Sequence, residues 1–251
     1  MADPMFDARL RSLRLARAKR QGEQLFLAER AVEDLAERLG YVTRSFGRAL
    51  IVGCPDALSP CLAGVAEQVL HAPALEDLAQ FAPGSFDLIL TLGQLDTTDE
   101  LPTMFLILHM LLAPEGMLAG VFPGNDSLPV LRTALLAADQ ASGGGFAPRV
   151  HPRIEASAVA GLLQQAGFAD PVVDIDRVRI RYPSLDRLIA DLRAMGATNV
   201  LRARRPPLNR TALAAARTGF REAGDERGTT ETIELIHFSA WTSDKSPLTT
   251  S

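Results

Sequence analysis

The segment after the first apolar run of this chain has residues whose types and spacing could hold a nucleotide-like ligand. The run from Ala49 to Val52 is followed by Gly53, as in the first strand and loop of nucleotide-binding α/β sheets. In such loops, further glycines let the backbone approach the ligand, but here their places hold Pro55 and Ala57. Proline has no N–H to donate, and alanine resists a positive φ. The sequence therefore predicts a nucleotide-binding scaffold with impaired ligand chemistry.

Nucleophilic and metal chemistry are both disfavoured. Cys54 could be a reactive thiol, but no histidine or cation stands beside it, so we expect a small side chain packed at a strand end. With Cys61 the chain has two cysteines, which cannot build a disulfide framework. We expect no metal site, because the four histidines lack the spacing of metal ligands. They are His71, His109, His151 and His237.

Length and composition indicate an ordinary globular protein. The chain has 251 residues, of which 47% are hydrophobic and 22% are charged, which is enough for one principal domain with a filled core. Its net charge of −4 argues against nucleic-acid binding as the main role. The most apolar stretch, residues 104–113, reads as a buried helix because it is far shorter than the ~20 residues that span a bilayer. Without a recognisable secretory signal, we expect a cytoplasmic protein.

The spacing of apolar residues predicts two helices at the start of the chain, followed by a succession of strands and helices. Helices are expected over residues 5–20, 23–39, 99–112, 127–141, 155–166, 184–195 and 211–223, and strands over 49–52, 68–71, 86–92, 117–122, 172–180 and 232–241. Ser59 and Ser184 are expected helix caps, with Pro60 in the first turn after Ser59, and a turn is expected over residues 114–116. We expect a helical lead-in (1–45), an α/β domain with helical insertions (46–241) and a disordered tail (242–251).

Short motifs with a recognisable order extend over nearly the whole length. They are Phe6-Asp7, Arg9-Leu10, Gly53-Cys54, Phe86-Asp87-Leu88, Leu101-Pro102, Asp126, Arg132, Gly144-Gly145-Phe146, Pro148, Pro152, Ala166-Gly167-Phe168, Asp174, Asp176, Tyr182-Pro183, Asp191-Leu192-Arg193, Met195-Gly196, Asn199 and Trp241. In these motifs the chain resembles the class I S-adenosylmethionine-dependent methyltransferases. It is most similar to the arginine-modifying complex I assembly-factor subgroup and to the malonyl-carrier-protein methyltransferases of biotin synthesis. The resemblance implies a Rossmann-like three-layer sandwich with a mostly parallel sheet.

The resemblance also implies where S-adenosylmethionine would bind. The cofactor would contact Gly53, Cys54 and Asp56 after the first strand, and Leu92 and Gln94 after the third. Asp56 could face the methionine amine of the cofactor in place of a lost carboxylate. Alternatively, Asp56 is a turn residue that caps a helix.

The chain departs from the resembled family at the residues that bind this cofactor. Ile51 replaces an acid on the first strand, Pro55 and Ala57 replace two glycines, and no carboxylate for the ribose follows the second strand in the right place. The segment between Gly53 and Phe86 has room for little more than a single βαβ unit, which needs roughly 30 residues. We therefore expect the family sheet to be shortened by one strand–helix unit.

Two functions of different classes follow from these observations. One is an enzyme that uses S-adenosylmethionine, or that modifies an arginine on a respiratory complex I subunit, with catalytic residues that the sequence does not assign. The other is a non-catalytic relative with weakened or lost cofactor binding that acts through a protein partner, such as a complex I subunit. The lost cofactor residues favour the second function.

Partner binding is expected over residues 144–199, which keep the family pattern best, and at the basic loop of Arg202, Arg204 and Arg205. Residues 143–146 could form a lid over a substrate cleft or a flexible connector. The arginines of the first helix could contact an acidic partner or a membrane surface, although a solvated helix face explains them more simply.

Overall fold

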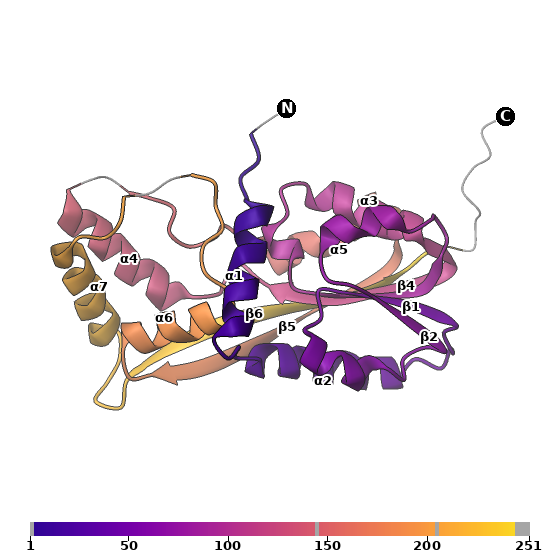
Figure 1. Ribbon diagram of the computed structural model, residues 1–251, viewed down its shortest axis with the longest axis horizontal. Helices are drawn as coiled ribbons and strands as arrows, with labels where there is room; N and C mark the ends of the chain where they lie inside the picture. Colours follow the sequence, from indigo (N-terminus) through magenta and orange to yellow (C-terminus); the bar gives the residue numbers. More distant parts are fainter. Residues whose placement is uncertain (1–2, 144–145, 204–205, 244–251) are drawn as a thin grey trace. The chain divides into compact units, whose positions relative to one another are not determined.

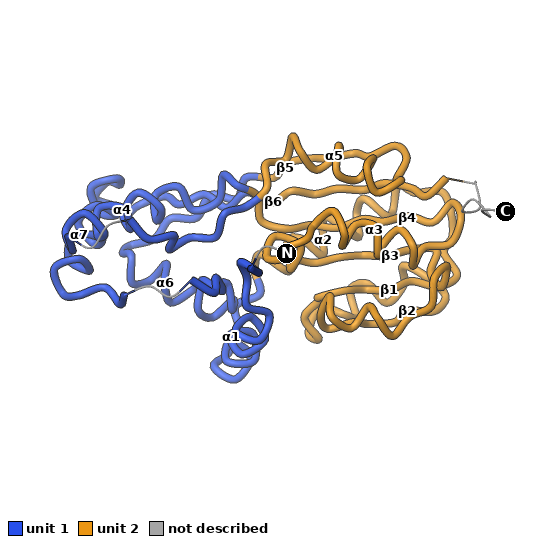
Figure 2. Tube along the Cα trace, turned by 90° about the horizontal axis from the view of Figure 1, so that it is seen from above, with its two compact units in different colours: residues 1–25, 125–153, 177–234 blue, residues 26–124, 154–176, 235–251 orange. Residues whose placement is uncertain are grey.

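A computed structural model describes residues 3–143, 146–203 and 206–243 of the chain. The residues gather in two compact units (Figure 2). Unit 1 comprises Met1–Leu25, Asn125–Arg153 and Arg177–Glu234, and unit 2 comprises Phe26–Gly124, Ile154–Asp176 and Leu235–Ser251. The separation of residues 1–45 from residues 46–241 stays a prediction. Gly144, Gly145, Arg204, Arg205 and most of the expected tail lie outside the described residues.

Six strands form one mixed sheet in the order β2-β1-β3-β4-β6-β5. Their bounds are β1 (Arg48–Val52), β2 (Gln68–Ala72), β3 (Phe86–Leu92), β4 (Leu112–Pro123), β5 (Ala169–Tyr182) and β6 (Thr229–Trp241). The strands β1 to β4 run parallel, and β6 runs antiparallel to β4. The mostly parallel sheet expected from the sequence is confirmed.

Helices cover both faces of the sheet within unit 2. Figure 1 shows α2 (Phe26–Gly40) on one face, and α3 (Leu101–Leu111) and α5 (Ala156–Gln165) on the other. The apolar residues of β3 are buried along nearly the whole strand, as expected for a parallel strand covered on both sides. Phe105 of α3 packs edge-on against Phe238 of β6, with 5.7 Å between ring centroids. This arrangement is the three-layer sandwich expected from the resemblance.

The stretch between β1 and β3 is shorter than in the full family sheet. It contains the single strand β2 and two 3-10 helices, η1 (Asp56–Leu62) and η2 (Leu75–Gln80), and no α-helix forms in residues 53–85. The expectation of one missing strand–helix unit is confirmed, and β2 is the edge of the sheet. The expected cap at Ser59 is wrong. Because the N–H of Leu58 already donates to the Pro55 carbonyl at 2.9 Å, the helix begins at Asp56, before Ser59.

Two further expectations need correction. The turn expected over residues 114–116 lies within β4, because this strand already pairs at Leu112 with Phe86 and then at Met117 with Leu88. The residues between these two positions form an irregularity that the apolar pattern alone could not reveal. The helix expected to be buried is α3, but its Met110 side chain is 59% exposed. Among the described residues, no helix has both the length and the apolar character that a bilayer span requires.

Unit 1 is mainly helical. It contains α1 (Ala8–Arg20), α4 (Pro129–Ser142), α6 (Leu185–Ala194), α7 (Arg210–Glu222) and parts of β5 and β6. The helices α4 and α7 lie side by side (Figure 1). The side chain of Ser184 accepts a hydrogen bond from the N–H of Arg187 at 3.3 Å, so the expected cap of α6 is confirmed. The N–H groups at the start of α4 are held by the buried carboxylate of Glu231, which accepts from Leu131 at 2.7 Å.

Candidate functional site

The loops at the carboxyl ends of β1 and β3 bring together three of the residues expected to bind the cofactor. Gly53 has a φ of +74°, and its N–H donates to the Ala72 carbonyl at 2.9 Å. A Cβ at this position would lie 2.6 Å from the Leu92 carbonyl oxygen and 2.7 Å from Gln94 Nε2. Only glycine fits here without strain. The close approach that the fold requires of Gly53 is thus made to other residues of the chain itself.

The side chain of Gln94 ties the loop after β3 to the loop after β2. Its Nε2 donates to the Pro73 carbonyl at 2.9 Å, and its Oε1 accepts from the N–H of Leu75 at 3.1 Å. The amide therefore uses one donor and one acceptor of the β2–η2 loop. The Gln94 amide also occupies the space that a Cβ at position 53 would need, so one side chain lies at the loops that follow β1, β2 and β3. We call this arrangement the Gln94 bridge.

The backbone at Gln94 is held in a strained turn. Gln94 has φ +65° and ψ −35°, and the N–H of Leu95 donates to the Gly93 carbonyl at 2.8 Å. This is a γ-turn with a positive φ at its central residue, which is a rare conformation for a residue with a side chain. The Gln94 carbonyl accepts from the N–H of Thr97 at 3.0 Å and from its hydroxyl at 3.1 Å. Surrounding hydrogen bonds thus hold a conformation that the chain would not adopt by itself.

Cys54 and Asp56 occupy the turn between β1 and η1. Burial raises the pKa of the Cys54 thiol above its ordinary value, and the thiol lies 3.5 Å from the Pro55 carbonyl as a weak donor. The thiol is therefore protonated at neutral pH and is a poor nucleophile. Asp56 is exposed as the first residue of η1. A ligand role for either residue stays a prediction.

The polar groups at this end of the sheet are engaged in contacts within the chain. After β2 the chain continues with Pro73 and Ala74, and the carboxylate of Asp77 accepts from the Ala74 N–H at 2.9 Å to cap η2. Ile51 is fully buried in the sheet, where the family has an acid. The carbonyl of Pro73 and the N–H of Leu75, in the loop after β2, already form hydrogen bonds with the Gln94 amide.

A second candidate site lies in unit 1, and part of its lining comes from the stretch that keeps the family pattern. A cavity of about 380 Å³ is bordered by α1, α4, α6 and nearby loops. Four arginines line it, namely Arg14, Arg149, Arg153 and Arg193. Among the residues that line this cavity, none is acidic. We call it the basic pocket.

Asn199 organises the wall of the basic pocket. Its Nδ2 donates to the Arg149 carbonyl at 2.8 Å, and its Oδ1 accepts from the N–H of Leu201 at 2.9 Å. Arg149 in turn pairs with Asp139, whose carboxylate is 2.7 Å from Arg149 Nε and almost fully buried. The sequence analysis missed this pair, although an aspartate in the apolar run of α4 was the available signal. Burial of such a charge requires a partner.

A shallower groove of about 540 Å³ lies in unit 1 beside the start of α4. Arg177 on its wall contacts Asp126 at 3.4 Å and the buried carboxylate of Glu234 at 3.1 Å. Arg132 donates to the Asn125 carbonyl at 3.0 Å. The family residues Asp126 and Arg132 thus take part in local contacts that shape this groove.

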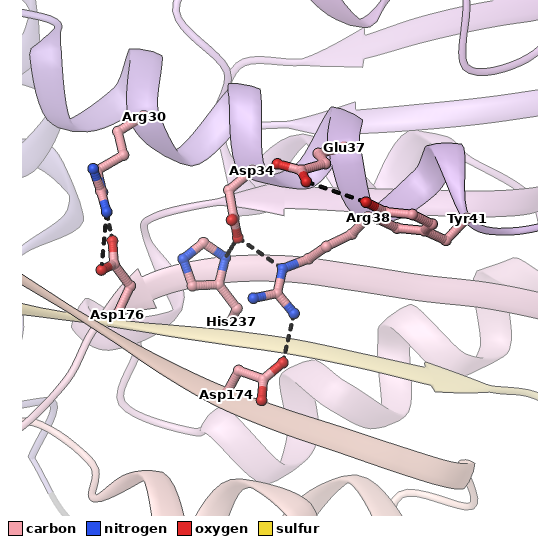
Figure 3. A network of polar contacts seen from close by, with 8 residues as sticks. All are labelled: Arg30, Asp34, Glu37, Arg38, Tyr41, Asp174, Asp176 and His237. Carbon is pink, nitrogen blue, oxygen red and sulfur yellow. Dashed lines mark hydrogen bonds and ion pairs between the residues drawn. The ribbon is translucent and has the colours of Figure 1, made fainter.

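Two acids that match the family, Asp174 and Asp176, hold α2 to β5 within unit 2 (Figure 3). Arg38 pairs with Asp34 at 2.7 Å and with Asp174 at 2.6 Å. Arg30 pairs with Asp176 at 2.5 Å, and this hydrogen bond lowers the pKa of Asp176. These two carboxylates of β5 therefore have a structural role here, because both contact arginines of α2.

His237 lies beneath this network (Figure 3). Its Nδ1 is 3.0 Å from the Asp34 carboxylate without a hydrogen bond between them, and its Nε2 has no hydrogen-bond partner among the described residues. Burial lowers the pKa of His237 below its ordinary value, despite the nearby acids. The ring is therefore neutral at pH 7.

Asp87 of the Phe-Asp-Leu motif lies at the amino end of the sheet. Its carboxylate accepts from the N–H of Gly47 at 2.7 Å and from the N–H of Arg48 at 2.9 Å. The carboxylate thus fixes the start of β1 beside β3. In this chain the contacts of the motif residue Asp87 are structural.

Comparisons with known proteins identify relatives in sequence and in fold. No family model matches the chain. The chain is 28% identical over 264 residues to the arginine-hydroxylase NDUFAF5, mitochondrial, of Rattus norvegicus, covering 94% of this chain and 77% of that protein. It is 33% identical over 172 residues to the malonyl-[acyl-carrier protein] O-methyltransferase of Xylella fastidiosa, covering 67% of this chain and 56% of that protein.

Two solved structures have a similar fold. A Bacillus halodurans protein assigned to the methyltransferases matches with a TM-score of 0.54 and 11% identity, covering 84% of this chain and 98% of that protein. The YcgJ protein of Bacillus subtilis matches with a TM-score of 0.54 and 12% identity, covering 85% of this chain and 98% of that protein. These likenesses confirm the Rossmann-like fold.

Proposed function

We propose that this chain, a methyltransferase-like homologue of NDUFAF5 and of the malonyl-carrier-protein methyltransferases, acts through a protein partner. In this proposal it does not act through S-adenosylmethionine bound in the family manner. The Gln94 bridge is the observation that carries this proposal. Its two hydrogen bonds use backbone groups of the loop after β2, and its amide lies where a side chain at position 53 would have to stand.

The expected loss of cofactor affinity is large. A hydrogen bond to a charged group contributes roughly 1.5–3 kcal/mol, so losing two of them weakens binding by about 10²- to 10⁴-fold. Ile51 and Pro55 cannot supply the charged and N–H contacts of the residues they replace. Asp77, which follows β2, is already engaged as the cap of η2. A cofactor would have to displace these internal contacts before it could bind.

Titration calorimetry of the full chain with S-adenosylmethionine tests the cofactor part of the proposal. We expect no saturable binding at micromolar concentrations, with S-adenosylhomocysteine as a second ligand that lacks the transferable methyl group. Gln94→Ala is the paired variant, and it should also fail to bind because the missing carboxylates are not restored. A micromolar dissociation constant for the unmodified chain would overturn this part of the proposal.

The proposed partner is a protein of the respiratory complex I assembly pathway, as the relationship to NDUFAF5 supports. We propose that its contact surface lies on residues 144–199, which keep the family pattern best and supply part of the lining of the basic pocket. The cytoplasmic location stays a prediction, since the NDUFAF5 relatives are named as mitochondrial. A membrane-surface contact through the arginines of α1 stays a prediction as well.

Capture of complex I subunits by the tagged full chain tests the partner surface. Arg193→Ala, Asn199→Ala and deletion of residues 202–207 are the variants, and Arg221→Ala, which is exposed on α7 outside the proposed surface, is the control. We expect reduced capture by at least one variant and unchanged capture by the control. Equal capture by all of these proteins would contradict the proposed surface.

An active enzyme is the second candidate function. The observation that favours it is the extent of the NDUFAF5 similarity, which covers 94% of this chain. In that case the protein would transfer a methyl group from S-adenosylmethionine or modify an arginine, with a rearranged cofactor site. Incubation with labelled S-adenosylmethionine and complex I subunits, followed by peptide mass analysis, would reveal either product.

A further inference from the structure

The basic pocket of unit 1 has more positive charge than its surroundings neutralise. Arg149 is paired with the buried carboxylate of Asp139. Arg14 instead donates from Nη1 to the neutral hydroxyl of Thr198, and its buried Nε has no hydrogen-bond partner among the described residues. In that same part of the chain, no carboxylate lies within ion-pair distance of Arg14 or Arg193. Arg14 and Arg193 are therefore cations without a paired anion in this pocket.

The electrostatic effect of this clustering is visible at Arg14. Burial lowers the pKa of Arg14, and the neighbouring charges of Arg17 and Arg193 lower it further. Like charges near a half-buried guanidinium oppose its charged form, while a bound anion would favour it. Guanidinium groups also bind planar carboxylates through paired N–H donors, which makes arginine well suited to this chemistry.

The lining of the basic pocket also includes apolar side chains. Leu131 and Leu192 are almost fully buried, at 6% exposure each, and line the same cavity as the arginines. Leu128, Leu135 and Ile189 line it as well. The cavity volume of about 380 Å³ lies within the size range of small-molecule sites. A ligand that matches both the charged and the apolar lining has one acidic group and one aliphatic part.

We propose that the basic pocket binds a small organic acid, with its carboxylate between Arg14 and Arg193 and its aliphatic part against Leu131 and Leu192. The hydroxyl of Thr198, which now accepts from Arg14, is placed to donate to the same carboxylate. The proposal goes beyond the proposed function. It concerns residues of unit 1 alone, and it requires neither S-adenosylmethionine nor a protein partner.

Titration calorimetry of the full chain with sodium hexanoate tests the proposal. We expect saturable one-site binding, with 1-hexanol, the neutral counterpart of equal chain length, binding at least about tenfold more weakly. Inorganic phosphate, which has charge but no aliphatic part, should also bind more weakly than hexanoate. Absence of saturable hexanoate binding, equal binding of the alcohol, or tighter binding of phosphate would each overturn the proposal.

Variants locate the binding site. Arg14→Met and Arg193→Met keep an unbranched side chain but remove the charge, and each should weaken hexanoate binding by about tenfold or more. Arg193 is exposed, so its variant is expected to fold even if Arg14→Met does not. Arg9→Met is the matched control, because Arg9 is exposed on α1 and does not line the cavity. Equal hexanoate affinity for Arg193→Met and Arg9→Met would place the ligand elsewhere and overturn the proposal.

Discussion

Substitution of Gln94 separates the two energetic contributions of the bridge. The amide makes two hydrogen bonds, each contributing about 1 kcal/mol net, while the positive φ of the same residue is unfavourable by about 1–3 kcal/mol for a residue with a Cβ. Gln94→Ala removes the hydrogen bonds but keeps the backbone strain, so it should lower the free energy of unfolding by about 2 kcal/mol. Gln94→Gly removes the hydrogen bonds and the backbone strain together, so it should lower the free energy of unfolding by about 1 kcal/mol or less.

The order of the two variants is therefore the test. At position 94 we expect glycine to be more stable than alanine by about 1 kcal/mol, because glycine adopts a positive φ without strain. The matched control is Glu33, which is exposed in the middle of α2. There, glycine should be less stable than alanine by about 1 kcal/mol, because a helix interior reverses the preference.

Urea unfolding of the full chain measures these differences. The single tryptophan, Trp241, reports on unit 2, since it stacks on Phe46 with 6.5 Å between ring centroids. Comparable slopes for all variants would justify comparing their midpoints. If alanine at position 94 were as stable as glycine, the γ-turn would not be strained. If both variants matched the unmodified chain, the two hydrogen bonds would contribute nothing.

Three further predictions concern stability. Gly53→Ala should lower the free energy of unfolding by more than about 2 kcal/mol, and the melting temperature with it, because its Cβ would lie 2.6 Å from the Leu92 carbonyl at φ +74°; an unchanged melting temperature would contradict the close packing. Asp87→Ala should cost about 2 kcal/mol in urea unfolding through two lost N–H contacts, and no loss would refute its role in fixing β1. Because burial lowers the pKa of His237, the unfolded state binds more protons near its ordinary pKa of about 6.5, and stability should fall as the pH drops through that value. His237→Leu should fall less between pH 7.5 and 5.5, although His109, whose pKa burial also lowers, retains part of the effect; an equal fall would contradict the assignment.

Elements that follow from local patterns could be predicted from the sequence. The strand β3 has the expected bounds because Phe86–Leu92 is a continuous apolar run after a turn. The cap of α6 at Ser184 was also foreseeable, since a serine before an apolar helical repeat is a common start signal. The shortened sheet followed from counting residues between Gly53 and Phe86, because a strand–helix unit needs a minimum length of chain.

Contacts between distant segments could not be predicted in this way. Gln94 was expected to contact a cofactor, but its amide reaches Pro73 and Leu75, which are about 20 positions away in the chain. The spacing of residues in the sequence does not show with which loop a flexible side chain will form hydrogen bonds. The ion pair of Asp139 and Arg149 could not be predicted either. The pair is strong because the carboxylate of Asp139 is almost fully buried, and the packing of α4 determines that burial. Local sequence could identify the candidate residues but not their partners.

The position of β2 at the border of the sheet has a consequence for self-association. A border strand presents unpaired N–H and carbonyl groups on which a foreign chain can add, with aggregation as the outcome. Here the strand has only five residues and is followed directly by Pro73, which has no N–H to offer. The sheet thus ends in a short, proline-terminated strand that gives little template for a further chain.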